Sequence, residues 1–539
     1  MASILTEAAP TSSEPVFKHS DSERAGARFH PLAVILPSLT DMIFVICLAA
    51  VVRIGNYFVS ADGDAARHLT VGEYLLSTGR LLREDVFSFT MFGQPFVPYE
   101  WLAEVASAAS YRVLGLAGPL LLHGAVIALA FSLVHARLRR RGESPLLAVG
   151  VVVLVTATSQ IHWLARPHVF SFLGTAVFCL ILDDWRAGRL SHKWLWALPV
   201  AMVLWANLHG GFLVGLLLIA TYVGADIVRG LAGPRETAAG AARSVRELLP
   251  VALITLAATC VNPVGLALLG HVFGWFGNTL LINLTQEYTS PNFHQAPVRA
   301  FAAMILVAVA GVAWSRRRPS LHEGLLLLGF LYLALFSSRN VPLFAIVVAP
   351  VLARQLAAMP LPGGRLGVSV GRLLTWLRRR DRVLARIEAR SRFHLWPVVI
   401  LVGLGAVAFV QRDAGAPLGV QFDPARQPVA AVAYLKAHPP QGHMFNNFIW
   451  GGYVLHELWP TQRVFIDGQT DFYGEALTQE YLDVQDVKPG WRDLLDRYDV
   501  QWIIFPSNSA LEQVLTASGI WDTAYRDAMA VVLTRHSPA

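Results

Sequence analysis

Asp62 and Asp64 are the residues whose types and spacing point most directly to chemistry. They lie two positions apart, just after the first apolar segment, and they open a polar stretch that runs to Glu104. Two carboxylates held close to a bilayer suit general acid–base work on a substrate that arrives through the lipid, and they also suit a divalent metal ion. A structural role is the alternative, because Asp is a favoured N-cap and Asp64 precedes a predicted helix from Ala65.

Two further groups in the same stretch have side chains that bind ligands. His68 follows Asp64 by four residues, so both share one helix face if a helix begins there. From that face His68 would orient a metal ligand or contact a phosphate; otherwise it is solvated. Glu100 and Glu104 lie one turn apart in a helix predicted from about Pro98 to Leu114. They either complete an acidic cluster or face water.

A second set of polar residues lies at the ends of later apolar segments. Arg166 and His168 join two such segments, His209 lies in the next junction on the same side, and Arg339 lies in a third. A membrane-embedded charge is costly, roughly 2.5–3.5 kcal/mol for Arg at a helix centre, and such groups usually face a cavity. We therefore expect one cavity on the side of Asp62 and Asp64, with the arginines binding a phosphate. Taken singly, each residue could instead be a snorkelling or loop residue. Glu287 in the 271–298 loop is either a metal ligand or substrate contact, or an exposed glutamate.

The elements that position these residues are predicted to be membrane helices. The chain of 539 residues is 54% hydrophobic and only 15% charged, against about 25% charged in soluble proteins. A spanning helix needs about 20 apolar residues. Eleven segments qualify: 34–52, 118–136, 145–163, 167–184, 194–207, 211–228, 248–270, 299–315, 321–337, 341–358 and 395–411. The 194–228 stretch could also form one broken helix.

The distribution of arginine predicts the orientation of these segments. If a tail of residues 1–30 is cytoplasmic, every loop on its side is basic, as the positive-inside rule requires. The last of these loops, 359–394, is arginine-rich with leucines at helical spacing, which is typical of an amphipathic helix on an anionic membrane surface or of a charged connector. The net charge of +7 is explained by these loops, so no nucleic-acid partner is expected.

The domain organisation follows from this orientation. A transmembrane domain occupies residues 31–411, and its large first outer loop is 53–117. The 412–539 region is predicted to be a small extracytoplasmic α/β domain, because Val464–Ile466 and Trp502–Phe505 are short apolar runs that suit buried strands. The three cysteines all fall inside apolar runs, so no disulfide framework is predicted.

The order of these parts resembles the GT-C superfamily of membrane glycosyltransferases, which includes protein O-mannosyltransferases, aminoarabinose transferases and oligosaccharyltransferases. The motifs D-A-A-R-H-L, G-E-Y-L-L-S-T-G-R, A-R-P-H-V-F-S, W-A-N-L-H-G-G-F and V-F-I-D-G…D-F-Y-G also resemble a large group of bacterial membrane proteins, most of them without an assigned function. This second similarity covers nearly the whole chain.

The resemblance implies an enzyme of the bacterial inner membrane that transfers a sugar from a polyprenyl-phosphate-linked donor on the outer face. An envelope glycan, lipid or protein would be the acceptor. In GT-C enzymes an Asp of the first loop acts as base or metal ligand, which here is Asp62 or Asp64, with Mg²⁺ or Mn²⁺ as the metal. The O-mannosyltransferases carry an adjacent Asp-Glu pair where this chain has Asp-Gly-Asp, so acceptor and metal dependence stay open. The alternatives are a metal-independent polysaccharide polymerase or ligase, and a non-enzymatic scaffold or transporter for an envelope polymer.

Overall fold

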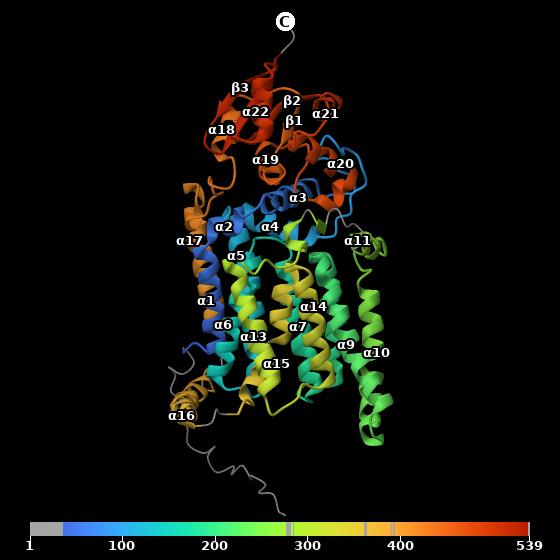
Figure 1. The fold of residues 1–539 in the computed structure, drawn as a ribbon, viewed down its shortest axis with the longest axis vertical. Coiled ribbons are helices and arrows are strands. Elements are labelled where there is room, and N and C mark those ends of the chain that lie inside the picture. The colour runs from blue at the N-terminus through green and yellow to red at the C-terminus, as the bar shows by residue number, and fades with distance from the viewer. Residues whose placement is uncertain are drawn as a thin grey trace, which may run out of the picture.

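Long helices packed side by side form the larger part of the molecule (Figure 1). The computed structural model describes residues 36–275, 282–283, 285–360, 364–389, 391 and 394–536, so the predicted tail of residues 1–30 lies outside it. The bundle helices within this part of the chain are α1 (Leu39–Arg53), α5 (Ala117–Arg140), α6 (Pro145–Ser159), α7 (Val169–Arg186), α8 (Ala197–Leu208), α9 (Leu213–Ala232), α10 (Arg235–Ala258), α13 (Arg299–Trp314), α14 (Leu321–Phe336), α15 (Val341–Ala357) and α17 (Trp396–Gln411).

Each predicted apolar segment coincides with one of these helices, although the match is not complete. Within the described residues, six helical segments are long and apolar enough to cross a membrane, and α14 is a shorter apolar helix. The prediction of 248–270 as one span was wrong in its boundaries. The helix α10 begins at Arg235, well before the predicted start. It ends at Ala258, because Asn262 and Pro263 interrupt the helical conformation before α11 (Ala267–Trp275). The 194–228 stretch forms two helices and not one.

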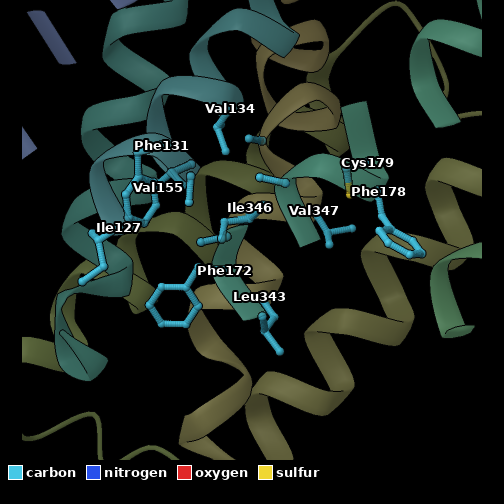
Figure 2. Close-up of a cluster of buried hydrophobic side chains, with 14 of the residues drawn as sticks. Ile127, Phe131, Val134, Val155, Phe172, Phe178, Cys179, Leu343, Ile346 and Val347 are labelled. Atoms are coloured by element: carbon cyan, nitrogen blue, oxygen red, sulfur yellow. The ribbon is translucent and has the colours of Figure 1, made fainter. Parts of the chain in front are cut away.

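The interior of the bundle is a close-packed apolar core centred on α15. Figure 2 shows side chains of α5, α6, α7 and α15 meeting there, among them Phe131, Phe172 and Ile346. Most side chains of α15 are buried, and its sequence is apolar on all faces from Val341 to Ala353.

At the end of the bundle away from the C-terminal domain, buried ion pairs tie the helices together. Asp183 of α7 lies 2.5 Å from Nε of Arg137 in α5, and its other oxygen accepts the hydroxyl of Tyr222 in α9 at 2.6 Å. Arg141 contacts the same carboxylate at 2.9 Å. The basic helix α16 (Gly364–Glu388) lies at this end as well (Figure 1), attached through Glu388 to Arg139 at 2.8 Å.

The first loop forms a helical layer between the bundle and the C-terminal domain (Figure 1). Its helices are α2 (Gly55–Ser60), α3 (Asp64–Thr78) and α4 (Trp101–Leu114). The mostly buried helix α3 ends at Gly79, whose left-handed conformation at φ 65° favours glycine.

The C-terminal domain is a four-stranded sheet with helices, as predicted. The sheet order is β1-β2-β4-β3, with β1 parallel to β2 and the other pairs antiparallel. The strands are β1 (His443–Asn446), β2 (Val500–Pro506), β3 (Trp521–Arg526) and β4 (Ala530–Arg535), and the helices are α18 (Val429–Ala437), α19 (Gly451–Leu458), α20 (Thr470–Gln485), α21 (Trp491–Arg497) and α22 (Ala510–Ala517).

One predicted strand of this domain belongs elsewhere. The Trp502–Phe505 run lies in β2, but the Val464–Ile466 run is not part of the sheet. Val464 pairs instead with the first loop, where its N–H donates to the Phe87 carbonyl at 3.1 Å and its carbonyl accepts from Phe89 at 3.1 Å. The apolar run therefore indicated burial correctly, but its hydrogen-bond partner comes from another part of the chain.

The first loop and the C-terminal domain also share one apolar core. Side chains of the loop pack in a single buried cluster with side chains of α19, β2 and β4. Phe87 of the loop, for example, packs edge-on against Trp459 at a centroid distance of 4.9 Å. The two regions therefore form one structural unit above the bundle.

We expect Asp183→Ala to destabilise the bundle strongly. The substitution leaves the buried guanidinium of Arg137 without its carboxylate, and breaking a buried pair in this way costs about 3–5 kcal/mol. The free energy of unfolding, measured by titration with SDS in mixed micelles, should fall by this amount. Glu73→Gln is the matched control, because its pair with Arg112 is 43–46% exposed and such pairs contribute only about 0–1 kcal/mol. Equal losses for both variants would contradict this assignment.

Candidate active site

The first carboxylates of the site lie at the start of α3. Asp64 is the first residue of this helix, and its backbone N–H donates to Oδ1 of Asp62 at 3.1 Å. The N-cap position is Gly63, and no side chain caps the helix, so the capping role considered for Asp64 is not observed. The Asp64 carboxylate projects from the first helical turn without capping it.

Arg166 joins both carboxylates to a third one. Its Nη1 lies 2.9 Å from Oδ2 of Asp62 and 2.6 Å from Oε1 of Glu287, and its Nη2 lies 2.9 Å from Oδ2 of Asp64. The Ala165 N–H donates to the Phe58 carbonyl of α2 at 2.9 Å, which holds this segment against the first loop. One guanidinium thus connects the loop after α1, the turn before α7 and the 271–298 loop.

Arg339 continues the network from Glu287. Its Nε lies 3.8 Å from Oε2 of Glu287, its guanidinium lies over the ring of Tyr288 at 4.9 Å and donates to the Tyr288 hydroxyl, and its Nη2 lies 3.5 Å from Nε2 of His209. Glu287, for which an exposed loop position was an alternative, is therefore the bridge between the two predicted arginines. The sidedness of its loop was the only sequence signal for this role.

Glu100 links the arginines to His68. Its carboxylate lies 3.7 Å from Nε2 of His209 and 3.9 Å from Nε2 of His68, and Nδ1 of His68 is 3.1 Å from Glu104. Nδ1 of His209 accepts the Gly211 N–H at 2.9 Å, so its Nε2 is the atom presented to Glu100. The predicted acidic cluster of Glu100 and Glu104 is therefore built around two imidazoles and does not face water.

His168 is the predicted site residue that stands apart. Its Nε2 lies 2.8 Å from the His162 carbonyl, and its ring centroid is 6.4 Å from that of His209. This bond leaves only Nδ1 of His168 for a ligand, so its phosphate contact stays a prediction.

Two further residues join the network, and the sequence did not predict their pairing. Arg67 of α3 lies 3.9 Å from Glu104 and 3.2 Å from Asp467 of the C-terminal domain. Both Arg67 and Asp467 are almost fully buried. Their separation of 400 residues leaves no local pattern that pairs them.

Burial and neighbouring charges shift the titration of these carboxyls in opposite directions. Burial raises the pKa of Asp62 to about 6 although Arg166 opposes the shift, and burial raises the pKa of Glu100 to about 7 although His68 opposes it. Burial also disfavours the charged form of Glu287, but Arg166 and Arg339 outweigh it and hold the pKa of Glu287 well below its usual range. The site thus combines an ionised carboxylate with two carboxyls that titrate near neutral pH.

The donor arrangement does not fit the predicted divalent ion. Asp62 and Asp64 both direct a carboxylate oxygen at the Arg166 guanidinium, which occupies the focus where a cation would be bound. Across the ranges that the structure describes, no group of three His, Cys, Asp or Glu side chains is placed to hold a metal ion.

An apolar cavity of about 490 Å³ adjoins the polar network. Trp101, next to Glu100, donates its indole N–H to Asn207 at 2.8 Å, and both residues line the cavity. The other lining side chains are Leu102, Val200, Val203, Leu204 and Val261. The cavity thus lies along α4 and α8, and its lining residue Asn207 is two positions before His209 in the sequence.

We expect Glu100→Gln to change the pH dependence of stability. The pKa of Glu100 is about 7 in the folded protein and about 4.5 when unperturbed, so the folded state keeps the proton longer than the unfolded chain. The stabilisation from protonated Glu100 is therefore present at low pH and is lost as the pH rises through about 7. In detergent, Glu100→Gln should leave Tm nearly unchanged at pH 5 and raise it at pH 8. A lower Tm for this variant at pH 8 would contradict the interpretation, and Glu73→Gln is the control.

Comparisons with known proteins agree with this architecture. No protein-family model matches the chain, and no curated protein matches it in sequence. Among solved structures, ArnT from Cupriavidus metallidurans bound to undecaprenyl phosphate is similar, with a TM-score of 0.50 and 13% identity, over 91% of this chain and 97% of that chain. The oligosaccharyltransferase AglB from Archaeoglobus fulgidus, in complex with an inhibitory peptide and a dolichol-phosphate, has a TM-score of 0.50 and 12% identity, over 87% and 69% of the two chains. At 12–13% identity, these similarities show that the chain shares the fold of ArnT and AglB.

Proposed function

We propose that this protein is a membrane glycosyltransferase that takes a sugar from a polyprenyl-phosphate-linked donor. The observation that carries the proposal is the Arg166–Glu287–Arg339 group beside Asp62 and Asp64, next to an apolar cavity. The similar structures add support, because one holds undecaprenyl phosphate and another dolichol-phosphate. The acceptor would be a glycan, lipid or protein of the cell envelope.

The two arginines would bind the phosphate of the donor. Planar guanidinium groups pair with phosphate oxygens in a bidentate manner and stabilise negative charge that develops on a leaving group. Arg339 is the more available of the two, because its carboxylate contact with Glu287 is 3.8 Å long, whereas Arg166 has three carboxylate contacts below 3.0 Å. His209 and His68 border the same group through Glu100 and would contact the sugar or the phosphate.

The apolar cavity would receive the first isoprene units of the donor. Its Val200, Leu204 and Val261 side chains are more than half exposed on the bundle surface, where a lipid chain is a suitable neighbour. Trp101 lies at the junction between this cavity and Glu100, so a lipid bound here would bring its phosphate towards the arginines.

Asp64 would act as the general base, with Asp62 as the alternative. The acceptor oxygen attacks the anomeric carbon while its proton passes to the carboxylate. The bond between the anomeric carbon and the phosphate oxygen breaks, and the electron pair leaves with the phosphate, where the arginines stabilise it. The Asp62 carboxylate already accepts the Asp64 N–H, whereas the Asp64 carboxylate accepts no N–H group of this turn, which favours Asp64 for proton transfer.

The membrane arrangement is part of the proposal. We propose that all eleven bundle helices of the described chain cross the bacterial inner membrane, with a cytoplasmic N-terminus and the C-terminal domain outside. The basic ends of α5 and α7 and the helix α16 lie at the end of the bundle opposite the C-terminal domain (Figure 1), which is the distribution that the positive-inside rule favours.

Arg339→Gln should weaken binding of undecaprenyl phosphate in detergent or nanodiscs. Loss of one charge-assisted contact costs about 1.5–3 kcal/mol, or roughly 10- to 100-fold in Kd. Arg112→Gln is the matched control, because Arg112 forms an exposed pair with Glu73 on the first loop, away from the cavity. An unchanged Kd for Arg339→Gln, or an equal loss for both variants, would argue against the assigned phosphate site.

Asp64→Asn should abolish transfer and leave lipid binding intact. Loss of a general base costs roughly 10²- to 10⁴-fold in rate. Transfer is followed in membranes with a radiolabelled sugar on undecaprenyl phosphate, and Asp62→Asn and the double variant are measured in parallel. Wild-type transfer by all three variants would reject carboxylate-dependent transfer and favour a polymerase or ligase that relies on Arg and His.

A further inference from the structure

The C-terminal domain contacts the first loop through backbone at the position of Asp64. Gly63 and Gly452 face each other so closely that a methyl group on either would overlap backbone atoms across the contact. Gly468 lies against Asp64 itself, and a methyl group there would fall well inside van der Waals contact with Oδ1 of Asp64. Only glycine allows an approach this close, so the fit depends on these positions.

A buried ion pair beside this contact connects the same two segments. Asp467 precedes Gly468, and its Oδ2 lies 3.2 Å from Nε of Arg67, one turn after Asp64 in α3. Its Oδ1 accepts the Gln469 N–H at 2.9 Å, so one carboxylate holds both its own turn and the first turn of α3. Asp467 is 2% exposed and Arg67 is 4% exposed.

We infer that the Asp467–Gly468 turn positions the Asp64 carboxylate for transfer. The Gly468 backbone limits the space that the carboxylate can occupy, and Asp467 fixes the helical turn beneath it through Arg67. The C-terminal domain would then complete the site without touching the donor phosphate. This inference rests on the proposed role of Asp64 as the base.

The position of a base matters because proton transfer requires a short, aligned contact. A displacement of about 1 Å can lower a rate by roughly 10²-fold. A shifted Asp64 should therefore lower the rate at saturating donor, whereas donor affinity, which depends on Arg166 and Arg339, should change little.

The test compares Gly468→Ala and Asp467→Asn in the full-length protein. Both should lower kcat for sugar transfer at least roughly 10-fold and leave KM for the lipid-linked donor and Kd for undecaprenyl phosphate within twofold. Hydrogen exchange of the peptide that covers residues 61–67 should become faster. Asp527→Asn is the matched control, because Asp527 also accepts backbone N–H groups in a turn of this domain, at 2.7 Å from Met529 and Ala530, but it lies in the β3–β4 turn. This control should change neither kcat nor the exchange of residues 61–67.

The possible results separate this inference from the function on which it rests. If Asp64→Asn is inactive but Gly468→Ala and Asp467→Asn keep the wild-type kcat, the positioning role is overturned and the proposed function stands. If undecaprenyl phosphate affinity falls together with kcat, the turn serves donor binding and the positioning role is again overturned. If Asp64→Asn itself keeps full activity, both proposals fail. If Gly468→Ala does not fold, the kcat of Asp467→Asn alone tests the positioning role.

Discussion

The contact of Arg166 with three carboxylates is the interaction on which the arrangement of the site depends. Asp62, Asp64 and Glu287 come from two loops that are far apart in sequence, and without a shared cation these carboxylates would repel one another. The Arg166 side chain is mostly buried. The three carboxylates therefore offset the desolvation cost of its charge, as Arg166 offsets their mutual repulsion. Arg166 therefore holds the two loops together. An anionic ligand could also bind its guanidinium in competition with these carboxylates.

The two ends of the bundle use buried charge differently. At the α16 end, Asp183 is enclosed by Arg137, Arg141 and Tyr222, and its pairing is complete. At the opposite end, Glu100 lies more than 3.5 Å from both imidazoles that face it, and Arg339 has a comparably long contact with Glu287. Short, closed pairs give rigidity, whereas longer contacts beside an apolar cavity can be exchanged for contacts with a ligand.

Sequence reasoning predicted the parts of this protein that depend on local patterns. The lengths of the apolar segments predicted the bundle helices. Their predicted orientation put Arg166, Arg339 and His209 on the same side of the membrane as Asp62 and Asp64, because orientation limits where a charged residue can lie. It did not predict that Asp62 accepts the Asp64 N–H, that Glu287 bridges the arginines, or that Val464 pairs with the first loop. These features depend on contacts between distant segments, which no periodicity records. Asp467 and Arg67 form the extreme example, since they are 400 residues apart.

The apolar core that the first loop shares with the C-terminal domain has a consequence for biogenesis. The loop leaves the ribosome early, yet the residues that cover Phe87 and pair with Arg67 are made last. At about 5–20 residues per second, the 400 residues between Arg67 and Asp467 take roughly 20–80 s to synthesise. During that time the loop exposes side chains that are buried in the finished protein. Newly made chains therefore pass through an interval in which this surface is open to aggregation, proteolysis or a chaperone.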